Sequence, residues 1–232
     1  MNWVGANRDL IVELTLTHAR LSLLPILIGF VVAVPLGAFA WRFRWARGLT
    51  LTVVGLLYTI PSLALFVLLP PIIGISFLSE LNVTIALSIY AVALMTRSAT
   101  EALESVDPDV RGAASAMGYS GWGRFWAVDL PLAGPVLLAG LRVVSVSTVS
   151  LVTVGVLVGS RNLGYLFLNG LQRGIVAEIA TGIVMTVLIA VVFDLLLATA
   201  GRLVMPWTRG AGAGAGRTRR AARRVALTEG PT

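Results

Sequence analysis

Long uncharged segments separated by short charged ones dominate the chain. The first, residues 21–41, has 21 positions without a charge, enough to cross a hydrocarbon core of roughly 30 Å at about 1.5 Å per residue. The next covers residues 48–79, but Pro70 and Pro71 should end its helix near Leu69, since proline cannot continue a helix. Three more stretches cover residues 81–96, 130–160 and 179–201. The pattern predicts an all-α polytopic membrane protein with about five transmembrane helices.

Three of these spans carry a feature that qualifies the pattern. Residues 81–96 give only 16 uncharged positions, so this helix should extend into its flanks or let Arg97 snorkel to the interface. The other two contain one charge each, Arg142 and Asp194. A charge within a span is a functional hypothesis by default. We expect the two residues to pair if their helices touch, and a structural role is favoured over a role in transport.

Composition supports a membrane protein and excludes several other classes. The chain is 57% hydrophobic and 12% charged, about half the charged fraction of a soluble domain, and such a composition also excludes wholesale disorder. There is no cysteine, so no disulfide framework or thiolate metal site exists. The sequence contains no Walker A or His-Glu-x-x-His motif, so we expect a chain that neither hydrolyses ATP nor binds a catalytic metal.

The distribution of arginine predicts the orientation in the membrane. All 18 basic residues are arginine, and the formal net charge is +7. With an external N-terminus, 13 arginines lie on the cytoplasmic side and four outside, as the positive-inside rule requires. The N-terminus should therefore be outside and the C-terminus cytoplasmic. The polar segment at about residues 97–135 then faces the cytoplasm.

That segment should contain a short helix. Asp107 suits the N-cap, Pro108 suits the first helical position and Gly118 suits the left-handed position after the last turn. An apolar stripe of mostly small side chains then follows at helical spacing: Val110, Ala113, Ala114 and Met117. Because so short a helix is unstable alone, it should lie either on its own membrane domain or in a cleft of a partner.

The run Gly112-Ala113-Ala114-Ser115-Ala116-Met117-Gly118, followed by Leu130-Pro131, resembles the EAA loop of ABC-importer permeases. That loop has Glu-Ala-Ala, three residues, Gly, and Leu-Pro about a dozen residues later; here Gly112 replaces the Glu. The resemblance implies a type I importer permease fold and a coupling helix that binds the ATPase. It assigns this coupling to the following residues: Gly112, Ala113, Ala114, Met117, Gly118, Leu130 and Pro131.

Two further stretches resemble the glycine betaine, carnitine and choline branch of these permeases. They are residues 59–64, Thr-Ile-Pro-Ser-Leu-Ala, and residues 159–164, Gly-Ser-Arg-Asn-Leu-Gly. Proline in a span frees backbone groups that neighbouring helices or water must satisfy. We therefore name Tyr58, Pro61 and Ser62 as candidates for the substrate pathway, although kinking for packing alone explains the proline equally well.

The resemblance implies a permease subunit for a quaternary-ammonium osmoprotectant in a bacterial cell membrane. Its partners would be an ABC ATP-binding subunit that holds ATP and Mg, an extracytoplasmic substrate-binding protein and a second permease subunit, identical or paralogous. A permease for methionine or another amino acid is the alternative, and a channel or secondary carrier without an ATPase is the alternative of another class.

The remaining features of the sequence concern the C-terminal tail and two activities that are disfavoured. Residues 1–205 should form the transmembrane domain, and residues 206–232 a disordered Arg-rich tail near anionic headgroups. Nucleic-acid binding is disfavoured because no folded module or stacking platform accompanies the arginines. Ser120 lies in a Gly-x-Ser-Gly similar to that of rhomboid proteases. The sole histidine, His18, should lie at the opposite interface, too far away to act as its base.

Overall fold

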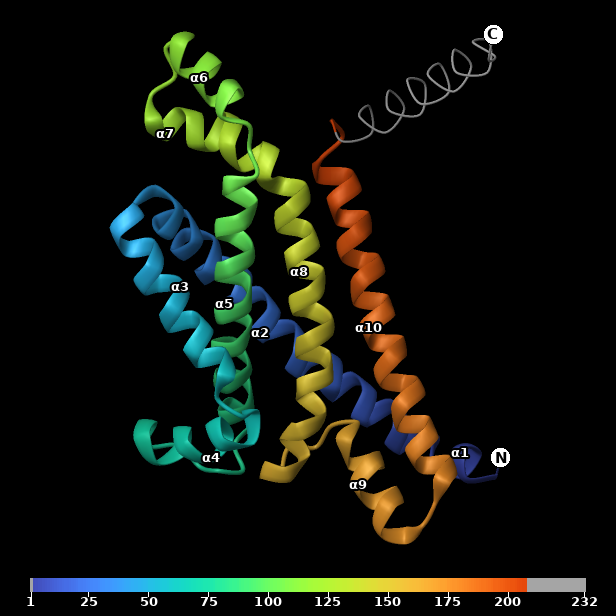
Figure 1. Ribbon diagram of the computed structural model, residues 1–232. Helices are drawn as coiled ribbons and strands as arrows, with labels where there is room; N and C mark the ends of the chain where they lie inside the picture. Colours follow the sequence, from blue (N-terminus) through green and yellow to red (C-terminus); the bar gives the residue numbers. More distant parts are fainter. Residues whose placement is uncertain (1, 208–232) are drawn as a thin grey trace, which may run out of the picture.

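The protein is a bundle of helices, and its computed structural model describes residues 2–207 (Figure 1). No strand occurs in this part of the chain. The helices are α1 (Asn2–Ala6), α2 (Arg8–Arg42), α3 (Arg44–Thr59), α4 (Ser62–Ile73), α5 (Glu80–Glu104), α6 (Pro108–Ala116), α7 (Gly121–Arg124), the π-helical turn η1 (Phe125–Asp129), α8 (Leu130–Val152), the 3-10 turn η2 (Thr153–Val158), α9 (Gly164–Arg173) and α10 (Val176–Val204).

Four segments are long and apolar enough to cross a membrane: α2, α5, the continuous helix Gly121–Val158, and α10. The pair α3 and α4 adds a fifth if the two are counted as one broken span, bent by 102°. The five predicted segments are therefore all present. The short stretch at residues 81–96 extends into both flanks, as expected, and forms the 25-residue α5.

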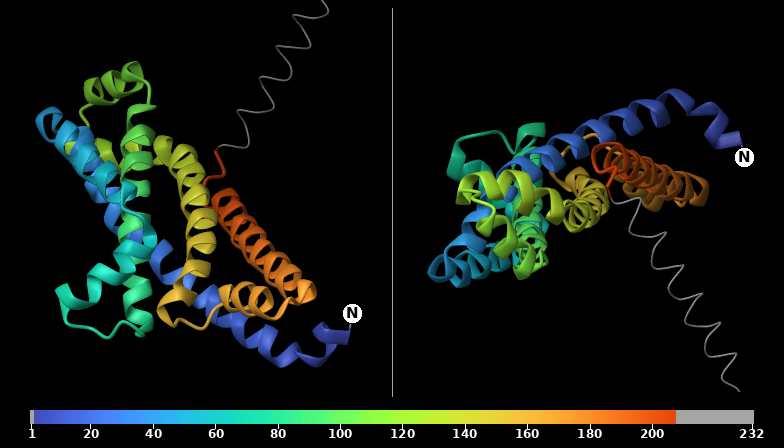
Figure 2. Two further views of the ribbon diagram at one scale, coloured as in Figure 1. Left: turned by 60° about the horizontal axis from the view of Figure 1, so that its bottom comes forward. Right: turned by 90° about the horizontal axis from the view of Figure 1, so that it is seen from above.

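The two ends of the bundle carry different elements. In Figures 1 and 2, α6, α7 and the C-terminal end of α10 lie together at one end, here called the α6 end. The N-terminus, α4 and α9 lie at the opposite end, here called the α9 end. An odd number of crossings explains this separation. The coupling-loop residues and the end of the described chain are thus on the same side of the bundle, opposite the N-terminus.

Helix α5 is the centre of the core, and α2 packs along it more extensively than any other helix. Small residues make this possible. A Cβ atom built on Gly29 would lie 2.6 Å from the Cβ of Ala91, and one built on Gly37 would lie 2.6 Å from the Cβ of Ala99. Glycine at these positions lets the two backbones approach closely, which is how helices commonly associate in membranes.

The predicted end of the second span near Leu69 is wrong. Helix α4 continues through Pro70 and Pro71 to Ile73, and Gly74 ends it with a φ of 73°. The break lies earlier, where Ile60 and Pro61 are extended, with ψ of 128° and 134°. A proline disfavours the helical conformation of the residue before it, so Pro61 breaks the span. The hydroxyl of Tyr90 donates to the freed carbonyl of Ile60.

The first and fourth spans begin earlier than predicted. Helix α2 begins at Arg8 rather than near Leu21, and the fourth continuous helix begins at Gly121 rather than at Leu130. In the fourth, the N–H of Leu130 donates to the carbonyl of Phe125, a π-helical bond. Pro131, which lacks an N–H, follows directly. The wider π turn keeps the chain helical across Pro131, whereas the sequence predicted that a new helix begins at Leu130.

His18 is a core residue, not an interfacial one as expected. Its side chain is fully buried, and its Nε2 lies 3.0 Å from the carbonyl oxygen of Val149 in α8. The N–H of Leu163 donates to its Nδ1 at 3.4 Å. His18 thus ties α2 to α8 and to the loop before α9. The predicted disordered tail falls almost wholly on residues 208–232, which lie outside the described part of the chain.

Candidate functional site

Helix α6 forms where the capping residues predicted it. The carboxylate of Asp107 accepts a hydrogen bond of 2.8 Å from the N–H of Asp109, Pro108 is the first helical residue, and Gly118 has a φ of 88°. A side chain at Gly118 would be strained in this left-handed conformation. The residues 107–131, from this cap to the Leu-Pro pair, are called the coupling segment below.

The predicted apolar stripe of α6 divides between two faces. Ala114 is 2% exposed and faces the protein itself, whereas Val110 and Met117 are 42% and 73% exposed. Ala113 and Gly112 are also exposed, and a Cβ atom on Gly112 would meet nothing within 4 Å. Ala114 therefore belongs to the packing of α6 on its own chain. The surface left for another molecule consists of the exposed side chains.

A buried carboxylate holds the coupling segment together. Asp129, at the end of η1, is fully buried. Its Oδ1 accepts from Nε of Arg111 at 2.9 Å, and its Oδ2 accepts from Nε of Arg124 at 3.3 Å. Arg124 also donates through Nη1 to the hydroxyl of Ser115 at 2.8 Å. A charge taken out of water needs such compensation, and here it fixes α6 against α7 and η1.

Arg111 extends this network to the transmembrane helices. Its Nη2 donates to the carbonyl of Leu103 near the end of α5, and its guanidinium lies 4.9 Å from the ring centre of Trp41 at the end of α2. Arg111 thus links α6 directly to α5, α2 and η1. Our sequence reasoning missed Asp129, Arg111 and Arg124 as functional candidates. The sequence does contain a sign of this network. Asp129 comes directly before the Leu-Pro pair, and two arginines that could pair with it precede it in the same segment.

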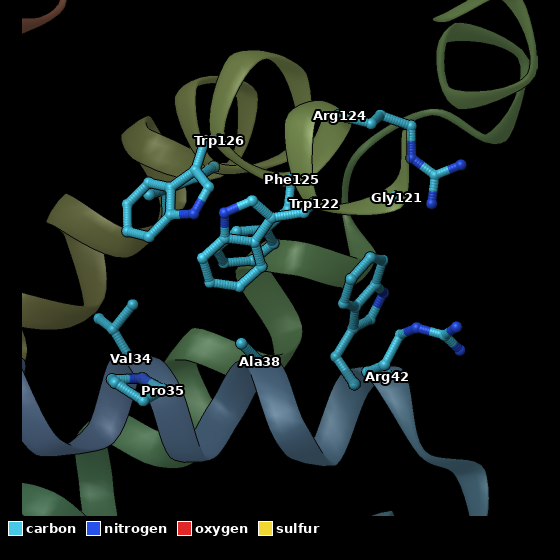
Figure 3. A pocket seen from close by; sticks show the side chains of 11 residues that line it. Val34, Pro35, Ala38, Arg42, Gly121, Trp122, Arg124, Phe125 and Trp126 are labelled. Atoms are coloured by element: carbon cyan, nitrogen blue, oxygen red, sulfur yellow. The ribbon is translucent and has the colours of Figure 1, made fainter. Parts of the chain in front are cut away.

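A cavity of about 510 Å³ separates part of the coupling segment from α2. Figure 3 shows Trp122, Phe125 and Trp126 on one wall, with Val34, Pro35 and Ala38 of α2 opposite. The three aromatic rings pack on one another, with centroids 5.3 to 6.2 Å apart. The segment is thus anchored through Asp129, while the neighbouring part of its contact with α2 is open.

Leu130 and Pro131 lie at the junction of η1 and α8, and both are half-buried. Leu130 lines the cavity and packs against the core around α5 and α8. The Leu-Pro pair therefore lies where the coupling segment joins the fourth span. Its position is internal, so it does not offer a surface to a partner in the way that Met117 does.

The candidate pathway residues lie at the bend between α3 and α4, toward the α9 end (Figure 1). Tyr58 is 45% exposed, and its ring packs edge-on against that of Tyr90 with centroids 5.9 Å apart. Pro61 is exposed and Ser62 half-buried. The structure brings the three together, but at the bend near one end of the bundle. The Tyr90 hydroxyl already satisfies the backbone group that the bend frees.

The two charges within the spans do meet. Nε and Nη2 of Arg142 in α8 donate to the two carboxylate oxygens of Asp194 in α10, at 2.5 and 2.6 Å. This two-bond geometry is the strong arrangement for Arg and carboxylate. The predicted contact between the fourth and fifth spans is confirmed. Across residues 2–207, no group of three or more His, Cys, Asp or Glu side chains is placed to hold a metal ion.

Comparisons with known proteins agree with one another. The family of binding-protein-dependent transport system inner membrane components matches residues 15–210. The osmoprotectant import permease protein OsmW of Salmonella typhimurium is 31% identical over 82% of this chain and 90% of its own. The glycine betaine/carnitine/choline transport system permease protein OpuCB of Bacillus subtilis is 28% identical over 89% and 94%.

The fold has a solved counterpart. It superposes on a chain of the inward-facing MetNI methionine ABC transporter with a TM-score of 0.70, covering 87% of this chain and 97% of that one, at 21% identity. At this level of identity the likeness concerns the fold alone, and it confirms the predicted importer-permease architecture.

Proposed function

The chain belongs to the family of binding-protein-dependent transport system inner membrane components, and from this premise we propose that it is the permease of an ATP-driven importer for a quaternary-ammonium osmoprotectant. Glycine betaine, carnitine and choline are the cargo candidates. Permeases named for these compounds cover nearly all of the chain at 28% and 30% identity. Methionine is the rival cargo, but the MetNI likeness at 21% identity speaks only for the fold.

The α6 end is assigned to the cytoplasm. The arginine distribution supports this orientation, since 13 of the 18 arginines belong to segments of the sequence that it makes cytoplasmic. The α9 end, with the N-terminus, then faces outward and receives a substrate-binding protein. A second permease subunit completes the pathway, and ATP and Mg are held by a separate ATPase subunit.

The coupling segment carries the mechanism. The exposed side chains of Val110 in α6 and of Met117, which caps its C-terminal end, offer a surface to the ATPase. The exposed Ala113 and Gly112 leave room for close approach. When ATP binding closes the ATPase dimer, α6 moves with it. The Asp129 network passes this movement to α5 and η1, and so to the fourth span. Coupling requires that the ATPase bind the two permease states with different free energies.

The observation that supports this proposal is that Asp129 bonds α6 to the rest of the chain while the outer face of α6 stays exposed. A free, mobile helix would transmit no force. A helix buried against its own chain on every side would offer nothing to a partner.

The test is ATP-dependent uptake by the reconstituted complex. The permease, its ATPase subunit and the binding protein are placed in proteoliposomes, and uptake of labelled glycine betaine is measured with ATP, with competing choline and with competing methionine. We expect uptake that needs ATP and is reduced by choline but not by methionine. Uptake without ATP would contradict an importer of this class, and competition by methionine alone would contradict the cargo.

Met117→Glu is the informative variant in this assay. Met117 is 73% exposed on α6, so a carboxylate there does not disturb the fold but should weaken the contact with the ATPase. We expect ATP-driven uptake to fall by about tenfold or more, a loss on the order of 1.4 kcal/mol in coupling. Leu203→Glu in the last turn of α10, on the same side of the bundle and with a side chain that is 76% exposed, is the matched control. Unchanged uptake by Met117→Glu would contradict the proposed role of α6.

A further inference from the structure

The Arg142–Asp194 pair lies well inside the two helices that carry it. Arg142 is ten residues from the end of α8 and Asp194 is ten residues from the end of α10, and these two helix ends lie at opposite ends of the bundle (Figure 1). Ten residues of helix rise about 15 Å, half of a 30 Å hydrocarbon core. Both charges therefore lie on the order of 15 Å from the nearer end of the helix that carries them.

The pair is not enclosed by its own chain. The side chains of Arg142 and Asp194 remain 42% and 31% exposed. Along α8, Ala139 and Val146 lie on the same face as Arg142, three residues before it and four residues after it, and both are exposed.

A cavity of about 140 Å³ lies between α2, α8 and α10. Leu141 and Ser145 of α8 line it together with Leu23 and Ile26 of α2 and with Phe193, Leu196 and Leu197 of α10. The two charged residues are not among the lining residues of this cavity, and within residues 2–207 nothing covers the ion pair fully.

Lipid tails would solvate the face of α8 and α10 that carries this ion pair poorly. Charged groups at the centre of a bilayer almost always face the bundle interior or a water-filled cavity, because hydrocarbon cannot solvate them. A half-exposed ion pair well inside two spans therefore indicates that this face of α8 and α10 borders an aqueous route. In a permease assembled from two such subunits, that route is the transport pathway.

We propose that Arg142 and Asp194 form a cargo-binding site on the wall of the pathway, for a zwitterion that carries a quaternary ammonium and a carboxylate. This inference rests on the proposed function and adds to it the residues that recognise the cargo in the membrane. The Arg142 guanidinium has the planar fork that binds a carboxylate through two hydrogen bonds. Asp194 attracts the quaternary ammonium, which has no hydrogen to donate.

The exchange of partners keeps every charge compensated. As the cargo enters, its carboxylate replaces Asp194 on Arg142, and Asp194 turns to the ammonium. As the cargo leaves, the two side chains pair again. At no stage is a lone charge left in the membrane, where an unpaired ion would be costly. The pair observed is the cargo-free state of the site.

Glycine betaine and choline separate this role from a structural one, because both carry the ammonium but only glycine betaine has the carboxylate. The experiment measures ATP-driven uptake of each compound by the reconstituted complex. We expect Arg142→Gln to lower the ratio of glycine betaine to choline uptake by roughly ten- to a hundredfold, the value of a charge-assisted hydrogen bond. Arg47→Gln is the matched control, since it breaks the exposed pair with Glu104 at 2.5 Å and should leave the ratio unchanged.

A second variant distinguishes a loss of cargo binding from a failure of the permease to fold or assemble. Arg142→Gln alone leaves Asp194 unpaired, so Arg142→Gln with Asp194→Asn removes both charges and keeps the shapes. Its ratio should fall as well, and the charge reversal Arg142→Asp with Asp194→Arg should not restore glycine betaine uptake. A ratio that stays at the wild-type value in both glutamine variants, or full restoration by the reversal, would overturn the proposal. If the wild-type complex takes up neither compound, the proposed cargo itself is wrong.

Discussion

The side chain of Asp129 determines how the helices of the coupling segment are held together. It is fully buried, while its partners Arg111 and Arg124 have side chains only 18% and 26% exposed. A buried pair of this kind adds little net stability compared with apolar packing, yet the loss of one partner is costly because the other charges remain uncompensated. The carboxylate therefore fixes the position of α6, and its removal should also destabilise the fold.

We expect Asp129→Asn to destabilise the protein by about 3–5 kcal/mol and to release α6. Trypsin should then cut after Arg111 and Arg124 much faster than in the wild type, because both guanidinium groups lose their carboxylate. Thermal unfolding in detergent, combined with a digestion time course, measures both effects. Glu101→Gln is the control, since it breaks the Arg97–Glu101 pair whose side chains are 72% and 60% exposed. Equal digestion of both variants would contradict the role of Asp129.

At the scale of the helices, the contact between α2 and α5 depends on small residues. A Cβ atom on Gly37 would lie 2.6 Å from the Cβ of Ala99 and 3.0 Å from the backbone nitrogen of Thr100. Since the second neighbour is backbone, the helices themselves must separate. Gly55 in α3 is the opposite case, because a Cβ atom there meets nothing within 4 Å.

We expect Gly37→Ala to cost about 1–3 kcal/mol, the usual effect of overpacking, while Gly55→Ala should be neutral or stabilise by up to about 1 kcal/mol through helix propensity. Both variants add the same methyl group to a transmembrane helix. Their midpoints of thermal unfolding in detergent give the comparison. A lower midpoint for Gly55→Ala than for Gly37→Ala would show that backbone approach between α2 and α5 is not the cause.

The ends of a helix were predictable where capping residues close in sequence determine them. The ends that depend on contacts with distant residues were not predictable. The cap at Asp107 and the glycine at position 118 fixed α6 from the sequence alone. The end of α4 was misplaced because a proline pair near the end of a helix and a proline at a break read alike in sequence. Pro61 is the break because Tyr90, thirty residues later, satisfies the freed carbonyl of Ile60.

The orientation of α6 about its own axis was beyond the sequence for a similar reason. Helical spacing places Ala114 and Met117 on one stripe, but the stripe is wide enough to be shared between two neighbours. The bonds from Arg111 to Asp129 and from Arg124 to Ser115 turn Ala114 inward and leave Met117 exposed. These contacts span up to 18 residues, so periodicity within α6 carries no information about them.

At the scale of the molecule, the bundle separates two tasks. The α6 end carries the Asp129 network and the exposed face of α6, and the α9 end carries the bend of α3 and α4 together with α9. The Arg142–Asp194 pair lies between them, ten residues from the end of α8 and ten residues from the end of α10. A movement of α6 that opens or closes the pathway at the α9 end must therefore pass the depth at which this ion pair lies.

Chemical cross-linking shows whether α6 contacts the ATPase in the assembled complex. The chain has no cysteine, so Met117→Cys and Leu171→Cys each introduce a single thiol at a position that is 73% exposed, one at each end of the bundle. In the assembled complex, a thiol-to-amine cross-linker should join Met117→Cys to the ATPase subunit, in an amount that changes with ATP, and should leave Leu171→Cys unlinked to it. Cross-linking of the ATPase to Leu171→Cys and not to Met117→Cys would contradict the account.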